Sequence, residues 1–97
     1  MHFVFYCKDK PGHEQVRIAN RLAHLEYLEV HKAQLFCAGP LLSESSGDGA
    51  RMIGSLLVLD LPDQQAANAF AAGDPYAKAG LFESVSIHPW RKVLPLA

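Results

Sequence analysis

The sequence predicts an α+β fold in which four antiparallel strands form one sheet, and two observations lead to this prediction. Short apolar segments of strand length lie at residues 2–8, 34–38, 52–61 and 84–88. Two longer segments free of Pro and Gly follow the first and third of them and suit helices. The order is therefore βαββαβ, the ferredoxin-like arrangement with both helices on one face and the usual strand order 4-1-3-2.

The first strand and first helix are predicted by different periodicities. In residues 2–8 the side chains alternate, which places Phe3, Phe5 and Cys7 on one face of a strand. Residues 13–32 contain neither Pro nor Gly and are typical of a long amphipathic helix. We expect its apolar stripe to face the core, and this stripe consists of Ile18, Leu22, Leu25 and Leu28.

The two middle strands are separated by a polar loop at residues 43–49. We expect the strand at residues 34–38 to end at Gly39-Pro40, because Pro lacks the backbone donor and Gly permits a bend. Residues 52–61 are almost continuously apolar, which is typical of a strand buried on both faces. This strand is therefore expected in the middle of the sheet.

The second helix is predicted at residues 64–72, and Gly73 ends it. The last strand, at residues 84–88, alternates before a Pro and Trp90, which we expect to pack the strand or a subunit contact. With helices on one face only, the other face of the sheet would expose apolar side chains. A homodimer joined sheet to sheet is the simplest cover.

Composition excludes several classes of function. The 97 residues suit a single domain, 1–97, and nine basic against ten acidic residues create no global field for nucleic acid or an anionic membrane. The first residues read as a strand rather than a signal peptide, and no apolar stretch approaches the roughly 18 to 20 residues that span a bilayer. We expect a cytoplasmic protein whose partner is a small molecule.

Cofactor, metal and disulfide chemistry have no support in the sequence. It contains no nucleophile elbow, phosphate loop, dinucleotide fingerprint or CxxC, so we expect no cofactor. His24 and His31 would lie about 10.5 Å apart along one helix, too far to share a metal. Cys7 and Cys37 would be separated by two strand spacings, roughly 10 Å, which exceeds the ~7 Å that a disulfide tolerates.

His24 and Asp74 are the strongest candidates for chemistry. His24 lies on a basic flank that borders the apolar stripe and also contains Arg17, Arg21 and His31. A histidine at such a border can act as an acid or base near neutral pH, or can simply bond a carbonyl. Asp74 precedes a Pro, so it could cap the next turn, or accept the imidazole N–H of His24 and orient the ring.

Three further residues could line a pocket around this pair. Tyr76 neighbours Asp74 and could orient a ligand, although packing alone would also explain it. Ser55, which follows Gly54 in an apolar strand, could make room for a ligand or indicate close packing. Arg21, one turn before His24, could hold a carboxylate or remain a solvated surface charge.

Five segments spread over nearly the whole chain resemble the YCII-related (YciI-like) family of the dimeric α+β barrel superfamily. They are Arg21-Leu22-Ala23-His24-Leu25, Ala38-Gly39-Pro40, Gly54-Ser55, Asp74-Pro75-Tyr76 and Pro89-Trp90-Arg91-Lys92-Val93. The resemblance implies the same ferredoxin-like fold, dimers formed through the sheets, and an active site centred on His24 and Asp74. It also implies kinship with muconolactone isomerases and a dehydrochlorinase-like branch, which act on small ring-derived acids and phenols.

The sequence therefore predicts a cofactor-independent enzyme that isomerises or eliminates on a small cyclic or acidic metabolite. His24 would be the general acid or base and Asp74 would orient it. The expected substrate-binding residues are Arg21, Gly39, Pro40, Ser55 and Tyr76. The alternative is a non-catalytic dimeric module that binds a metabolite or a protein, in which His24 and Asp74 serve the structure.

Overall fold

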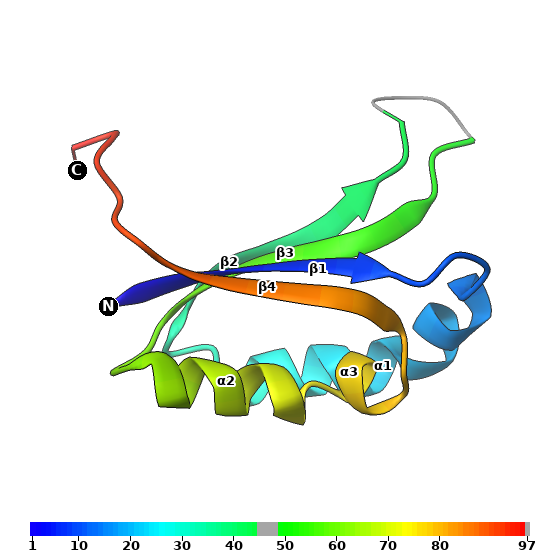
Figure 1. The fold of residues 1–97 in the computed structure, drawn as a ribbon, viewed down its shortest axis with the longest axis horizontal. Helices are drawn as coiled ribbons and strands as arrows, with labels where there is room; N and C mark the ends of the chain where they lie inside the picture. Colours follow the sequence, from blue (N-terminus) through cyan, green and yellow to red (C-terminus); the bar gives the residue numbers. More distant parts are fainter. Residues whose placement is uncertain (45–48, 97) are drawn as a thin grey trace.

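The computed structural model describes residues 1–44 and 49–96, and it contains one antiparallel sheet with three helices against it (Figure 1). The elements are β1 (His2–Asp9), α1 (Glu14–Val30), β2 (Leu35–Leu42), β3 (Met52–Asp60), α2 (Gln64–Gly73), α3 (Pro75–Lys78) and β4 (Phe82–Trp90). The predicted order is confirmed, and the expected turn after α2 is the short helix α3. No helix in the described ranges is long and apolar enough to cross a membrane.

The sheet has the order β2-β3-β1-β4, and every neighbouring pair is antiparallel. This is the predicted order 4-1-3-2 counted from the other edge. β3 lies inside the sheet, as its apolar sequence predicts. All three helices lie on one side of the sheet, and no helix of the described residues covers the opposite face (Figure 1).

β2 continues past the point where the sequence predicts its end. Gly39 and Pro40 lie inside the strand, which runs to Leu42, and Pro40 pairs with Ser55 of β3. The predicted end is wrong because β2 is an edge strand, where a residue without an N–H can be accommodated. As a result, the Gly39-Pro40 segment lies beside Ser55 instead of in a turn.

The core lies between the sheet and the helices. Phe3 pairs with Leu59 and Phe5 with Leu57 across β1 and β3, and all four side chains are at most 1% exposed. Phe70 of α2 packs on Phe5 with 5.3 Å between the ring centroids. These contacts attach α2 to the centre of the sheet and leave the other half of the same face to α1.

The buried face of α1 is not the one that the sequence predicts. The buried residues are Arg17, His24 and Leu28, so two members of the basic flank, Arg17 and His24, face the sheet. Of the predicted apolar stripe only Leu28 is buried, while Ile18, Leu22 and Leu25 are 65%, 70% and 49% exposed. The prediction is wrong because polar groups beneath the helix form hydrogen bonds with the basic flank, which makes its burial tolerable.

The burial of Leu59 in β3 and the exposure of Leu22 on α1 predict unequal costs for two Leu→Ala substitutions. Leu59→Ala removes a fully buried side chain and is expected to lower the free energy of unfolding by about 2–5 kcal/mol. Leu22→Ala removes a side chain that is 70% exposed and is expected to change it by less than about 0.5 kcal/mol. Denaturant unfolding of both variants measures the difference. Equal costs would show that α1 buries the stripe after all.

Both cysteines are free, Cys7 being buried in β1 and Cys37 exposed in β2, with β3 between their strands. Burial raises the pKa of Cys7 to about 12, and the negative charges of Asp74 and Asp9 act in the same direction. Cys7 is therefore a neutral thiol at physiological pH. It behaves as a small apolar side chain and is no nucleophile.

Candidate active site

A pocket of about 160 Å³ opens between α1, the β2–β3 edge of the sheet and the start of α3. Its lining residues are Arg17, Arg21, His24, Leu25, Leu28, Ala38, Gly39, Pro40, Met52, Ser55, Leu57 and Tyr76. Every residue predicted for the site is among them except Asp74, which contacts His24 from outside the pocket wall. The fold thus brings together residues from four separate segments of the chain.

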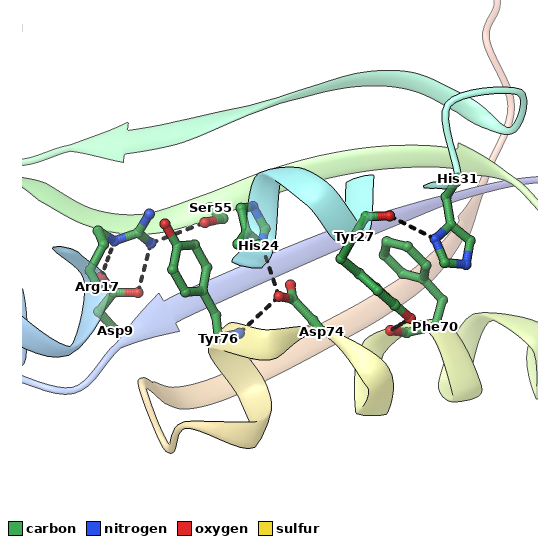
Figure 2. Close-up of polar contacts among 9 residues, drawn as sticks. All are labelled: Asp9, Arg17, His24, Tyr27, His31, Ser55, Phe70, Asp74 and Tyr76. Carbon is green, nitrogen blue, oxygen red and sulfur yellow. Dashed lines mark hydrogen bonds and ion pairs between the residues drawn. The ribbon is translucent and has the colours of Figure 1, made fainter. Parts of the chain in front are cut away.

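His24 and Asp74 form a buried hydrogen bond, with 2.8 Å between His24 Nδ1 and Asp74 Oδ1 (Figure 2). Their side chains are only 9% and 4% exposed. α1 supplies His24 from its buried face, and Asp74 sits at the junction of α2 and α3, with Pro75 starting α3. Asp74 Oδ1 also accepts the backbone N–H of Tyr76 at 2.9 Å. The carboxylate therefore caps α3 and contacts His24 at the same time.

The contact with Asp74 determines how His24 presents its second nitrogen. A carboxylate can only accept hydrogen bonds, so Nδ1 of the neutral imidazole carries the proton and Nε2 keeps its lone pair. No residue in the described ranges 1–44 and 49–96 forms a hydrogen bond with Nε2. Within these ranges every fully buried side-chain nitrogen or oxygen has a hydrogen-bond partner, so Nε2 is not fully buried. Nε2 is thus accessible from the pocket that His24 lines. This atom can accept a proton there.

Tyr76 lies at the base of the site between the side chains of His24 and Arg17. Its ring stacks on the His24 imidazole, with 4.0 Å between centroids and 15° between planes, and the Arg17 guanidinium lies 4.7 Å from its centroid. In Figure 2 the ring stands between Arg17 and His24. Burial raises the pKa of Tyr76, and this effect outweighs the lowering by the charges of Arg17 and Arg21. The phenol keeps its proton at neutral pH.

Arg17 is the site residue that the sequence reasoning missed. Its Nε and Nη2 donate to the two oxygens of Asp9 at 2.8 and 3.0 Å, and Nη2 also donates to Ser55 Oγ at 3.0 Å. Burial alone would lower the pKa of Arg17, but the bonds and charge of Asp9 raise it overall. The available signal was its spacing, two helical turns before His24 on the same flank. Its hydrogen-bond partners lie on β1 and β3, and helical spacing cannot reveal contacts with a strand.

The two strand segments of the pocket contribute differently. Ser55 is 3% exposed, and its hydroxyl accepts a hydrogen bond from Arg17. The same residue also lines the pocket. A Cβ on Gly54 would collide with the Cys7 carbonyl, which explains this glycine by close packing of β3 on β1. A Cβ on Gly39 would meet nothing within 4 Å. Gly39 and Pro40 therefore form an open, low wall of the pocket.

Arg21 and His31 lie at the edges of this arrangement. Arg21 is exposed, lines the pocket, and makes no hydrogen bond or ion pair with the residues that the structure describes. His31 lies outside the pocket, where its Nδ1 contacts the Tyr27 carbonyl and its ring packs against Phe70. No three metal-ligating side chains gather anywhere in the described ranges. The residues of the site are those around His24.

Comparison with known proteins identifies the family and agrees with the fold. The pattern of the YCII-related domain matches residues 1–91. The chain belongs to the YCII-related family. Protein YciI of Escherichia coli O6:H1 is 36% identical over 97 residues, which cover 96% of this chain and 99% of that protein. An "Uncharacterized protein" of Haemophilus influenzae is 33% identical over the same shares of both chains.

A solved structure similar to this YCII-related protein carries a ligand. It is the 5-chloro-2-hydroxyhydroquinone dehydrochlorinase TftG of Burkholderia phenoliruptrix AC1100, in complex with 2,5-dihydroxybenzoquinone. The two chains are 41% identical, superpose with a TM-score of 0.88, and are each covered to 94%. The family and the ferredoxin-like fold predicted from the sequence are therefore confirmed.

Proposed function

We propose that this protein is an enzyme in which His24 acts as a general acid and base on a small one-ring metabolite, without a cofactor. The observation that carries the proposal is the orientation of His24. Asp74 holds Nδ1, and Nε2 is accessible from a pocket that other polar side chains also line. Such a carboxylate stabilises one tautomer and the imidazolium that forms when Nε2 takes a proton.

The chemistry needs successive proton transfers at one nitrogen and a place for the charge that develops between them. Nε2 removes a proton from a hydroxyl or from a carbon next to a carbonyl, and the electron pair moves into the ring as an enolate. In an isomerisation the imidazolium returns the proton to another carbon. In an elimination the imidazolium first returns the proton to the ring carbon that carries the leaving group. Nε2 then removes the proton of a second hydroxyl, the new electron pair expels an anion such as chloride from that carbon, and a quinone-like product remains. Neither path requires an oxidant or a metal.

The size of the site and the similar structure support a one-ring substrate. A pocket of about 160 Å³ has room for one substituted six-membered ring, and its walls combine apolar side chains with Arg21, Ser55 and Tyr76. TftG, named as a dehydrochlorinase, was solved with 2,5-dihydroxybenzoquinone, which is such a ring. We therefore expect this protein to act on ring-derived acids or phenols, and elimination of chloride is the reaction to test first.

The direct test is chloride release from 5-chloro-2-hydroxyhydroquinone, measured with purified protein against a protein-free control. We expect release that scales with protein concentration. The Asp74→Asn variant retains an oxygen to cap α3 but loses the charge that stabilises the imidazolium, so its rate is expected to fall while its melting temperature changes little. No release by the wild-type protein would contradict the proposed elimination.

The rival function, a binding module without catalysis, predicts a different response to the same substitution. If Asp74 serves only the structure, Asp74→Asn should lower the melting temperature clearly, because a buried hydrogen bond to a charged group is weakened. A catalytic pair can be altered at little cost in stability. Melting temperature and rate, measured on one preparation, therefore separate the two functions.

We also propose that two chains associate through the uncovered face of the sheet. Aromatic and apolar side chains gather there: Tyr6 is 44% exposed, Phe36 51%, Leu56 37% and Trp90 39%. Tyr6 and Leu56 are direct partners across β1 and β3. A face of this composition favours contact with a second copy over contact with water.

A charge on this face tests the proposed dimer. Leu56→Glu places a carboxylate in the middle of the sheet face and is expected to convert a dimer into a monomer, measured as molar mass by light scattering. Leu22→Glu, on the exposed side of α1, is the matched control and should leave the mass unchanged. A wild-type protein that is already monomeric at high concentration would contradict the proposal.

A further inference from the structure

Ser55 is placed so that its hydroxyl can donate only into the pocket. A serine hydroxyl has one proton to donate and two lone pairs that accept. Arg17 has no acceptor, so in the 3.0 Å contact between Arg17 Nη2 and Ser55 Oγ the hydroxyl must be the acceptor. Among the described residues no group accepts the Ser55 proton, although the residue is only 3% exposed. The pocket is the remaining direction for that proton.

Tyr76 presents a second hydroxyl with the same property. Its O–H makes no donor contact with any residue in the two described ranges, and the side chain lines the same pocket. In Figure 2 the Tyr76 hydroxyl points toward Arg17 and Ser55. Because the phenol stays protonated at neutral pH, it too has a proton to donate. Two donors from different elements therefore lie near one end of the pocket.

Arg17 is held firmly enough to position both hydroxyls. Asp9 accepts two hydrogen bonds from the Arg17 guanidinium. The side chains of Arg17 and Asp9 are 7% and 8% exposed. One edge of this guanidinium bonds Ser55, and it also lies against the Tyr76 ring. Since Asp9 balances its charge, Arg17 can align the hydroxyls without becoming the counterion of the ligand itself.

We infer that Ser55 and Tyr76 form an oxyanion-binding site, that Arg17 is its positioning residue, and that its ligand is the enolate or phenolate oxygen of a one-ring molecule. This inference rests on the proposed function, because the enolate arises when His24 Nε2 removes a proton. Donors that are already aligned before the charge develops stabilise it without a cost of reorientation. Binding of an oxyanion that is already formed needs no proton transfer, and it can be measured separately.

The test compares two ligands that differ in the oxygen that the site would bind. 4-Nitrophenol ionises near neutral pH and its phenolate absorbs visible light, whereas nitrobenzene has a similar ring without the phenolic oxygen. We expect the wild-type protein to bind 4-nitrophenolate more tightly than nitrobenzene in calorimetric titrations. The bound phenol should also ionise at a lower pH than the free phenol, which its absorbance reports.

Substitutions in the site should remove this preference selectively. Ser55→Ala is expected to weaken 4-nitrophenolate about tenfold or more and nitrobenzene little, because a hydrogen bond to a charged oxygen is lost. Ser55→Thr keeps the hydroxyl and should restore the preference. Arg17→Lys keeps the charge but loses the fork that bonds Asp9 and Ser55, and it should reproduce the loss seen in Ser55→Ala.

The outcome for His24 separates this inference from the proposed function. His24→Gln should slow turnover by about 10²–10⁴-fold but retain the preference for 4-nitrophenolate, because Ser55, Tyr76 and Arg17 are unchanged. If a substitution at Ser55 or Arg17 removes the preference for 4-nitrophenolate but leaves turnover intact, only the oxyanion site is contradicted and the proposed function stands. Equal losses of both ligands in Ser55→Ala would overturn the inference, as would a wild-type protein that binds 4-nitrophenolate no more tightly than nitrobenzene or binds neither.

Discussion

Replacing His24 by Gln is expected to slow chloride release from 5-chloro-2-hydroxyhydroquinone by about 10²–10⁴-fold, the usual contribution of a positioned general acid or base. The glutamine amide can still donate to Asp74 Oδ1, so the helix contact is partly conserved. It has no lone pair that accepts a proton at neutral pH. The loss should therefore appear in kcat, with a smaller change in KM.

His31→Gln is the matched control for this variant. His31 lies on the C-terminal side of the same helix, and it contacts Tyr27 and Phe70 outside the pocket. The same exchange at this position should leave the rate within a few-fold of the wild-type rate. If the two variants lose the same activity, or if His24→Gln keeps the wild-type kcat, His24 is not the acid–base group.

Asp9→Asn is expected to lower the free energy of unfolding by about 3 kcal/mol or more, as is usual when one partner of a buried ion pair is removed. Arg17 and Asp9 are 7% and 8% exposed and share two hydrogen bonds. In the variant the guanidinium remains buried without a counterion. The cost can be measured by urea unfolding monitored at more than one wavelength.

An exposed ion pair at the C-terminal end of α1, between Glu29 and the following Lys32, provides the control for Asp9. Lys32 and Glu29 lie 3.2 Å apart with side chains 73% and 71% exposed, so Glu29→Gln should cost less than about 1 kcal/mol. If Asp9→Asn costs no more than Glu29→Gln, water must reach Arg17. The rigid support that we assign to Ser55 and Tyr76 would then be absent.

Much of the fold follows from local patterns in the sequence. Alternation in β1, the apolar run of β3 and the Pro-free span of α1 predict their elements, and their order predicts the sheet. The end of β2 was misplaced because a local rule for Pro40 ignores whether the strand lies at an edge. That fact depends on which strands pair, and pairing is a property of the whole chain.

Two residues of the candidate site could be singled out from their local sequence. His24 stood out as a titratable residue on the border of a helix, and Asp74 as a carboxylate before Pro75. The orientation of α1 was not predictable from its apolar spacing, because Ile18 and Leu22 give the helix an apolar side that this chain leaves exposed. Burial of the other side depends on contacts of Arg17 with Asp9 at the end of β1 and with Ser55 of β3, and helical spacing reveals neither contact.

The tautomer of His24 is the most direct measure of the central claim, that Asp74 orients this imidazole for acid–base work in the pocket. ¹⁵N NMR of the ring nitrogens distinguishes a protonated nitrogen from a bare one. At a pH where His24 is neutral, we predict that Nδ1 carries the proton and Nε2 is bare in the wild-type protein, and that Asp74→Asn weakens this preference. A proton on Nε2, or the same mixture of tautomers in both proteins, would contradict the account.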